Sequence, residues 1–336
     1  MARLDRLEPG KEIAQIGSCI GRTFSYDLLS RVSNISGKDL RESLKTLVDN
    51  ELVIQRGTES RATYTFKHAL IQDVAYASLL KKKRQRVHGE IATRLITEFP
   101  EIEQTEPELL AHHFTEAALP DQAVPLWLLA GQKALLSWAS TEAIAHLSKG
   151  LNLVITKTPN EPRNTLELDF QVALGTALMR MYSWGSKESG AAYRRAAELC
   201  ESVNDTDRLI PTLWGDFTFT LGTGNIPAIQ VSQNRNMEIA RKRDNSDVLF
   251  FAYATATVTA FISGSFVDTQ TNAQQCHELY DPQRHAELVT SLNHDLDLTA
   301  QAWESQCMWL LGYPDQARKI CDHKDQMALN QGHLFQ

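Results

Sequence analysis

The chain has 336 residues, which is enough for two or three domains with substantial cores. Charged residues make up 22% and the formal net charge is −7, so bulk electrostatics do not favour nucleic acid or an anionic membrane as a partner. The five cysteines are odd in number, widely spaced and never arranged as Cys-x-x-Cys. They indicate reduced thiols and exclude a disulfide framework or a zinc site. Because the N-terminus also lacks the apolar core of a signal peptide, we expect a cytoplasmic protein.

Residues 1–99 contain the predicted elements of one domain with a small β-hairpin. Apolar residues recur at helical spacing in three successive segments, which predicts three helices. Two short β-favouring runs at 52–54 and 64–66 then flank a polar turn that contains Gly57, which predicts the hairpin. Three helices followed by a two-stranded wing is the order of a winged-helix domain. The apolar positions are Ile13, Ile16 and Ile20, then Leu28, Leu29 and Val32, then Leu40, Leu44, Leu47 and Val48.

Two further helices are predicted directly after the hairpin. The first opens at His68, and its expected apolar face consists of Leu70, Ile71, Val74 and Leu79. The second carries an apolar stripe formed by Val87, Ile91 and Leu95. A histidine at a helix N-terminus lies where backbone N–H groups and the helix dipole favour an anion such as phosphate.

Residues 100–336 show only helix-length amphipathic segments separated by short turns, and some of the turns repeat. The string 119–123 (Leu-Pro-Asp-Gln-Ala) recurs at 313–317 as Tyr-Pro-Asp-Gln-Ala, and Gly224, Gly264 and Gly312 occupy equivalent turns. The intervals between these glycines are 40 and 48 residues, longer than the ~34 of a tetratricopeptide repeat (TPR). We therefore expect irregular TPR-like hairpins that stack into a right-handed superhelix with a concave binding face.

One uncharged stretch, Val248–Val267, is long enough to cross a bilayer. It is diluted by alanine, serine and threonine, which favours a helix packed between neighbouring helices. The membrane alternative remains open at this point. The six tryptophans are expected to pack between hairpins rather than to form a ligand cage, and they are Trp127, Trp138, Trp184, Trp214, Trp303 and Trp309.

Several strings resemble a known family, the bacterial class III adenylate/guanylate cyclase–ATPase–TPR signalling proteins. They are the segments 21–24, 51–53, 64–76, 107–113, 143–147, 280–285 and 309–317. The resemblance implies a predominantly α-helical C-terminal regulatory region, with a winged helix followed by a TPR-like superhelix.

The chain contains no Gly-x-x-x-x-Gly-Lys-Ser/Thr string, so it lacks the phosphate-binding loop of the family's ATPase domain. It also stops at Gln336, inside what should be another repeat helix. We therefore expect a fragment, either a truncated reading frame or one piece of a split protein. The implied function is non-catalytic: the superhelix binds a protein partner and the winged helix restrains an ATPase domain.

The resemblance also implies a role for His68. In related signal-transduction ATPases a winged-helix histidine of a Met-His-Asp-like motif contacts the β-phosphate of bound ADP. The string Phe66-Lys-His68 occupies the matching place, although Ala69 replaces the acidic residue. His68 is therefore a nucleotide-sensing candidate. The alternative is that it caps the helix or packs beside Tyr64.

The strongest electrostatic feature is the basic run at 81–86. It could contact an acidic face of an ATPase domain or DNA phosphates, or it could be a solvated helix start. Positive and negative side chains balance in the third helix, which argues against nucleic acid as a partner. A DNA-binding transcription regulator is therefore only the alternative function. The contact candidates are Lys81, Lys82, Lys83, Arg84 and Arg86.

No residues support an enzyme. Cys19 stands in a Gly-x-Cys-x-Gly string similar to a nucleophile elbow, but helical periodicity continues through it. His112 and His113 are adjacent and would point in different directions on a helix, without a third ligand nearby. Asp295 and Asp297 are interpreted as solvated acids at a helix start. We expect no catalytic residue, no metal and no cofactor.

Overall fold

The computed structural model describes residues 10–33, 35–58, 61–158, 160–183, 185–203, 205, 208–292 and 294–330, without the side chains of 290, 291 and 323–330. It is 78% helical with one small sheet, which confirms a predominantly α-helical fold. By packing, the chain divides into two compact units: residues 1–136 with 145–153, and residues 137–144 with 154–336. The domain boundary expected near residue 99 stays a prediction.

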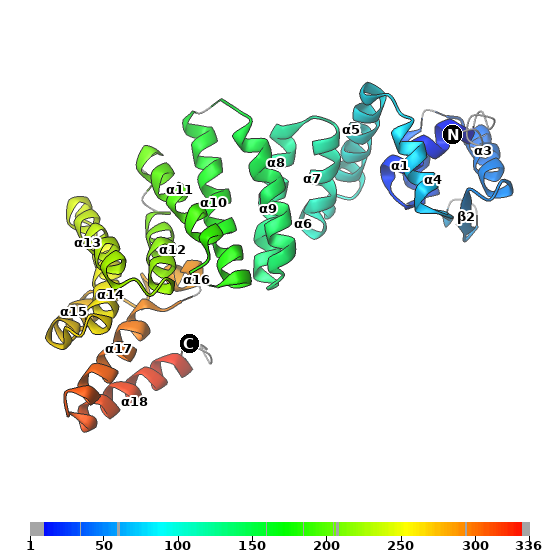
Figure 1. Cartoon of the computed structure of the whole chain (residues 1–336). Coiled ribbons are helices and arrows are strands. Elements are labelled where there is room, and N and C mark those ends of the chain that lie inside the picture. Colours follow the sequence, from blue (N-terminus) through cyan, green and yellow to red (C-terminus); the bar gives the residue numbers. More distant parts are fainter. Residues whose placement is uncertain are drawn as a thin grey trace. The chain divides into compact units, whose positions relative to one another are not determined.

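The first unit begins with the expected order of three helices and a hairpin (Figure 1). Its helices are α1 (Gly10–Ile20), α2 (Tyr26–Val32) and α3 (Gly37–Asp49), and the hairpin consists of β2 (Val53–Arg56) and β3 (Thr63–Phe66). A third strand, β1 (Thr23–Ser25), pairs antiparallel with β3 and gives the sheet order β1-β3-β2. Three residues are too few for a period-2 pattern, so this strand could not be predicted.

A close approach between Gly17 of α1 and Phe24 of β1 explains the glycine inside the helix. A Cβ atom at Gly17 would lie 2.8 Å from the Phe24 ring, which stacks on Tyr64 with ring centroids 5.8 Å apart. Cys19 lies within α1, as helical periodicity predicted. Burial raises the pKa of its thiol to about 12, so the thiol remains protonated and unreactive.

Five more helices complete the first unit, together with part of α9 (Ser140–Ile155). The expected apolar face of α4 is wrong at Leu70, which is 72% exposed, whereas Ala75 and Leu79 are buried. The predicted stripe of α5 is confirmed, because Val87, Ile91 and Leu95 are all buried. The bounds are α4 (Ala69–Ala77), α5 (Lys81–Glu98), α6 (Ile102–Thr105), α7 (Pro107–Glu116) and α8 (Pro120–Leu136).

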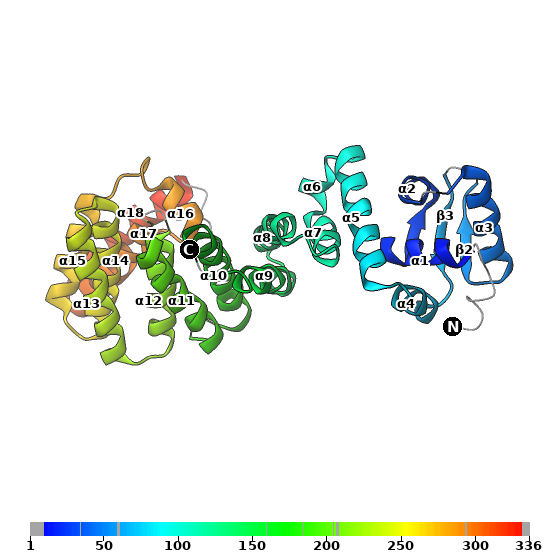
Figure 2. The same cartoon turned by 90° about the horizontal axis from the view of Figure 1, so that it is seen from above.

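The second unit is a TPR-like series of helices in which most helices pack on the next one in the chain, as Figures 1 and 2 show. Contacts beyond the next helix also occur: α17 packs on α14 and α15 as well as on α18, and α12 contacts α10, α14 and α16. Gly224, Gly264 and Gly312 have φ of +67°, +77° and +87°, which explains glycine at these turns. The helices are α10 (Glu161–Tyr182), α11 (Lys187–Val203), α12 (Leu209–Gly222), α13 (Ile226–Arg243), α14 (Ser246–Ile262), α15 (Phe266–Leu279), α16 (Ala286–Leu292), α17 (Leu296–Leu310) and α18 (Pro314–Asn330).

Tyr193 of α11 packs between glycines of the two neighbouring helices. Cβ atoms at Gly175 of α10 and Gly215 of α12 would lie 2.9 Å and 2.1 Å from the Tyr193 ring. The ring is buried, and its hydroxyl lies 3.1 Å from Thr176 Oγ1. Small residues on both sides therefore allow three helices to pack closely around one aromatic ring.

The uncharged stretch forms α14, the central buried helix of the second unit. The hydroxyls of Thr255, Thr257 and Thr259 donate to backbone carbonyls of the same helix, so their burial leaves no unmade hydrogen bond. The interpretation as a buried repeat helix is confirmed. Within the part of the chain that the structure describes, no helix has both the length and the apolarity that a membrane crossing requires.

The expectation that all tryptophans pack between hairpins is wrong in two cases. Trp127 and Trp214 are buried and Trp303 packs against the core of the second unit. Trp138 and Trp309 are 69% and 65% exposed. Trp138 lies in the turn before α9, where the Arg180 guanidinium of α10 lies 4.5 Å from the centroid of its ring, and Trp309 lies in the last turn of α17. Trp184 lies outside the described residues.

Candidate functional site

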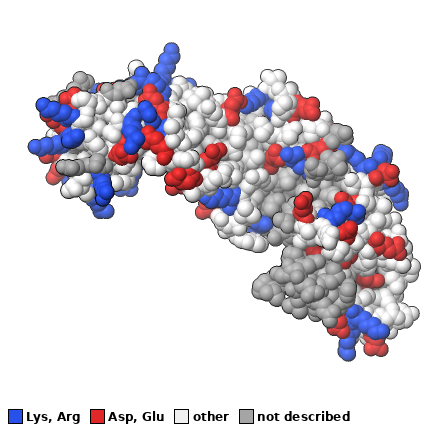
Figure 3. All heavy atoms as spheres, turned by 180° about the vertical axis from the view of Figure 1, so that it is seen from behind, with Lys and Arg blue, Asp and Glu red and all other residues white. Residues whose placement is uncertain are grey.

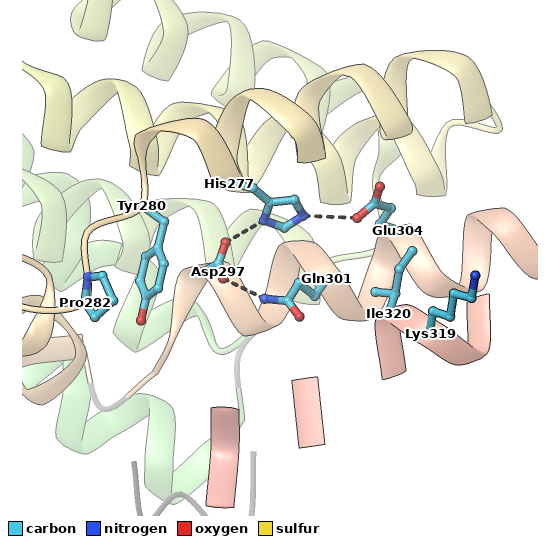
Figure 4. Close-up of a pocket in the computed structure, with 8 residues that line it drawn as sticks. All are labelled: His277, Tyr280, Pro282, Asp297, Gln301, Glu304, Lys319 and Ile320. Atoms are coloured by element: carbon cyan, nitrogen blue, oxygen red, sulfur yellow. Dashed lines mark hydrogen bonds and ion pairs between the residues drawn. The ribbon is translucent and has the colours of Figure 1, made fainter. Parts of the chain in front are cut away.

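A cavity of about 670 Å³ lies in the second unit between α15, α17 and α18 (Figure 4). Its volume is in the range of small-molecule and peptide side-chain sites, roughly 300–1,000 Å³. One wall is polar and the others are largely apolar. The lining residues are His277, Tyr280, Pro282, Asp297, Gln301, Glu304, Lys319 and Ile320.

The cavity arises from the irregular length of the repeat that contains it. The interval from Gly264 to Gly312 is 48 residues, and the extra length includes the short helix α16. Tyr280 ends α15 with an extended backbone (ψ 130°), and Pro282 follows. Proline cannot continue a helix, so the chain turns away here and the two residues form one side of the cavity.

The polar wall consists of one histidine between two carboxylates. His277 Nδ1 lies 2.6 Å from Asp297 Oδ1, and His277 Nε2 lies 3.0 Å from Glu304 Oε2. A neutral imidazole has one N–H, so only the imidazolium donates to both carboxylates. Burial of the ring lowers the pKa of His277, but the hydrogen bonds and charges of the two carboxylates together outweigh it and raise the pKa to about 9. His277 is therefore charged at neutral pH.

A single face of α17 positions the acceptors of this wall. Asp297, Gln301 and Glu304 are spaced i, i+4 and i+7, which places them on the same side of the helix. Gln301 Nε2 donates to Asp297 Oδ2 at 2.7 Å, so both oxygens of this buried carboxylate are occupied. These contacts connect α15 with α17, which are separated in the sequence by the segment that contains α16.

The charge on His277 limits the chemistry that this wall can perform. His277 is protonated and donates both N–H groups, so it cannot act as a general base at neutral pH. None of the lining residues is a serine or cysteine nucleophile. Among the residues that the structure describes, no group of three or more His, Cys, Asp or Glu side chains could hold a metal ion.

His68, the predicted nucleotide-sensing residue, lies in the first unit at the N-cap of α4 and is exposed. Its backbone is extended (φ −132°, ψ 140°) and its side chain makes no capping hydrogen bond, so His68 is the N-cap residue by position but its imidazole does not cap the helix. The other alternative was that His68 packs beside Tyr64, and the aromatic ring that stacks on Tyr64 is Phe24. An exposed imidazole at a helix N-terminus leaves the sensing prediction open.

The basic run forms the first turns of α5, and its members have different surroundings. Lys81 and Lys82 are exposed. Lys83 pairs with Glu12 at 2.8 Å, and Arg86 lies 3.6 Å from Glu90. The Arg84 guanidinium lies 4.9 Å from the centroid of the Tyr76 ring. Three of the five predicted contact residues therefore have partners within the first unit, and their role in partner binding stays a prediction.

The sequence analysis missed His277 and Glu304, and its interpretation of Asp295 and Asp297 as solvated acids is wrong. Asp295 and Asp297 are 1% and 2% exposed. Asp295 does start the helix, because it accepts hydrogen bonds from the backbone N–H groups of Asp297 and Leu298. The polar face of α17, spaced i, i+4 and i+7, was the one sequence signal for this site. Its partner His277 could not be found from that spacing, because it lies twenty residues before Asp297 on another helix.

A second polar cluster is buried in the first unit between α4, α5 and α7. Tyr76 donates to Glu116 Oε2 at 2.8 Å, and His88 Nε2 lies 3.1 Å from the Tyr76 oxygen. Since the single hydroxyl proton goes to Glu116, His88 Nε2 donates to Tyr76. His88 Nδ1 then accepts from His113 Nδ1 at 2.9 Å. Burial lowers the pKa of His88 to about 4 and of His113 to about 3, so both imidazoles are uncharged at neutral pH. We interpret these hydrogen bonds as structural.

His112 and His113 are oriented as predicted, because His112 is exposed and His113 is buried. Both rings nevertheless lie near His88, with centroids 5.7 Å (His112) and 5.1 Å (His113) from the centroid of the His88 ring.

Comparisons with known proteins give limited similarity. No protein-family profile matches the chain. Uncharacterized protein R02095 of Rhizobium meliloti (strain 1021) is 24% identical over 318 residues, which is 93% of this chain and 30% of that protein. A solved signal transduction ATPase with numerous domains, which has a tetratricopeptide repeat sensor and comes from Pyrococcus horikoshii, superposes with a TM-score of 0.42 and 9% identity. That superposition covers 97% of this chain and 64% of the other. The chain thus spans less than two thirds of either protein.

Proposed function

We propose that this chain is a non-catalytic regulatory region whose TPR-like helices bind a ligand or a segment of a partner protein. The observation that carries the proposal is the cavity between α15, α17 and α18, which a lengthened repeat builds from three helices and one turn. Stacked helical hairpins characteristically present such concave surfaces to partners. A cavity with mainly apolar walls and a few oriented polar groups is the usual form of a binding site.

We further propose that residues 10–66 are a winged helix that restrains an ATPase domain of the cyclase–ATPase–TPR type. The order α1-β1-α2-α3-β2-β3 and the family-like strings support this assignment. A cytoplasmic location fits the described cysteines, all of which are free thiols. The class III cyclase relationship and a bacterial source rest on the strings alone.

The test is to sequence the DNA directly upstream of the chain, to express the chain together with any ATPase domain encoded there, and to measure complex formation and ATP hydrolysis. The proposal predicts a complex in which hydrolysis is slower than that of the ATPase domain alone. His68→Ala is expected to speed ADP release in the complex, and Lys67→Ala is the matched neighbouring control. Absence of a complex, or hydrolysis unchanged by the chain, contradicts the regulatory role.

The alternative function, DNA binding through the winged helix, is favoured only by the exposed Lys81 and Lys82 at the start of α5. Positive and negative side chains are interspersed on the surface seen in Figure 3. A DNA-binding protein that neutralises several phosphates loses affinity steeply as salt rises. Binding to random duplex DNA that falls at least about tenfold between 50 and 200 mM salt supports this alternative.

A further inference from the structure

We propose that the cavity between α15, α17 and α18 binds a cationic head group, an ammonium or guanidinium, carried on an apolar body. This inference rests on the proposed binding function and names the chemistry of its ligand. The same head group occurs on a lysine or arginine side chain of a partner polypeptide and on a free amine, and the experiment below separates the two sources.

The first argument is the hydrogen-bonding capacity left on the polar wall. The imidazolium of His277 donates both of its N–H groups to Asp297 and Glu304, so it has no donor left for a ligand. Both oxygens of Asp297 accept hydrogen bonds. Glu304 Oε2 accepts from His277, whereas its Oε1 has no recorded partner among the described residues. The charged group that this wall offers to a ligand is therefore an acceptor.

The second argument is the sign of the charge on the polar wall. Two carboxylates and one imidazolium sum to one net negative charge at neutral pH. The remaining charged lining residue is Lys319 of α18, which is exposed and therefore well hydrated. Its charge is screened by solvent, whereas the charges at Asp297 and Glu304 are mostly buried. Complementarity thus favours a cation at the inner wall.

The third argument is the composition of the other walls. Tyr280, Pro282 and Ile320 present apolar surface, and Figure 4 shows the Tyr280 ring on the side of the cavity away from Lys319. Apolar surface accommodates the carbon body of a ligand. An aromatic face also attracts cations through its quadrupole. A ligand with a cation at one end and hydrocarbon behind it satisfies both kinds of wall.

The experiment measures binding of matched probes to the full chain by titration calorimetry. The small-molecule probes are 4-phenylbutylamine, the neutral 4-phenylbutanol and the anionic 4-phenylbutyrate, which share one body. The peptide probes are acetyl-Ala-Leu-Arg-Ala-amide and the same peptide with citrulline, a neutral isostere of arginine. The proposal predicts at least one cationic probe that binds about tenfold more tightly than its neutral counterpart. Preference for the amine or for the arginine peptide identifies the source of the head group.

Two substitutions locate the effect. Glu304→Gln keeps the shape of the side chain and removes its charge, so it is expected to abolish the preference for the cationic probe. Lys319→Gln removes the other charge and is expected to retain that preference. Thermal melting of each variant checks folding, and binding of 4-phenylbutanol checks that the cavity is still open.

Three outcomes overturn the inference. Tighter binding of 4-phenylbutyrate that Lys319→Gln abolishes would make this an anion site. Equal binding of all three small probes would leave an apolar cavity without charge selection. No binding of any probe, together with a normal complex with the ATPase domain, would remove the cavity as a cation site and leave the proposed regulatory role standing.

Discussion

The second unit should become progressively less stable at alkaline pH, because His277 loses its proton and with it the ion pairs to Asp297 and Glu304. The histidine has a pKa of about 9 in the folded chain and about 6.5 when unfolded. The folded state therefore binds more protons between these values, so stability is fully present below pH 6.5 and is lost as pH rises through 9. A difference of 2.5 pKa units corresponds to about 3 kcal/mol at most, because one unit is ~1.4 kcal/mol.

The perturbation is His277→Gln, which can still donate to one carboxylate but carries no charge. The difference in unfolding free energy between the natural chain and this variant should shrink by about 3 kcal/mol between pH 6 and pH 10. His68→Gln is the matched control, because it alters an exposed histidine of the first unit that makes no capping hydrogen bond. A pH-dependent change in unfolding free energy that both variants share would not be assigned to His277.

The assay is urea unfolding with a short pulse of a thiol-alkylating reagent, read by mass spectrometry of cysteine-containing peptides. Cys276 is fully buried in α15, next to His277, and reacts only when the second unit opens. Cys19 is buried in the first unit and provides an internal reference in the same sample. A difference between natural chain and variant at Cys276 that stays constant, or grows, from pH 6 to pH 10 would refute the assignment of a charged His277.

Two further predictions concern packing and acid stability, and a third concerns catalysis. The first unit should lose stability as pH falls below 6.5 towards 4, because the pKa values of the buried His88 and His113 are lowered and the unfolded state binds more protons there. Labelling of Cys19 should then occur at lower urea at pH 4.5 than at pH 7, and an unchanged midpoint would contradict this. Gly215→Ala should cost about 1–3 kcal/mol because the added methyl group overlaps a tyrosine ring. Gly89→Ala, whose methyl group meets its nearest atom at 3.7 Å, should be neutral or stabilising by up to ~1 kcal/mol, and equal urea midpoints of the two variants would count against the packing argument. The purified chain should not hydrolyse ATP or make cyclic nucleotide, and turnover that survives repurification and is lost in a point variant would overturn this.

Helical periodicity and turn glycines predicted most of the fold because both are local signals. The stripe Val87, Ile91 and Leu95 was identified correctly since burial of one helix face requires that spacing. The turn at Gly264 was identified since a left-handed backbone conformation favours glycine. Leu70 was misassigned because spacing shows which residues share a face and not whether another element covers that face.

The candidate site could not be predicted because its residues meet only through tertiary packing. Asp297 has the sequence context of a helix start, and such acids are usually hydrated. It is buried because α15 brings His277 within 2.6 Å, and this contact depends on how the inserted α16 segment folds back. His68 is the opposite case. A local sequence string singles it out as a candidate, but in the structure it is exposed and is not part of a packed site.

Hydrogen exchange of the full chain with and without 4-phenylbutylamine tests most directly whether the cavity is the binding site. Ile320 lines the cavity and Arg318, its exposed neighbour on α18, does not. The account predicts that the probe protects amides of α15, α17 and α18, that Ile320→Trp fills the cavity and abolishes this protection, and that Arg318→Trp retains it. Equal protection in the two variants, or protection confined to other helices, would contradict the account.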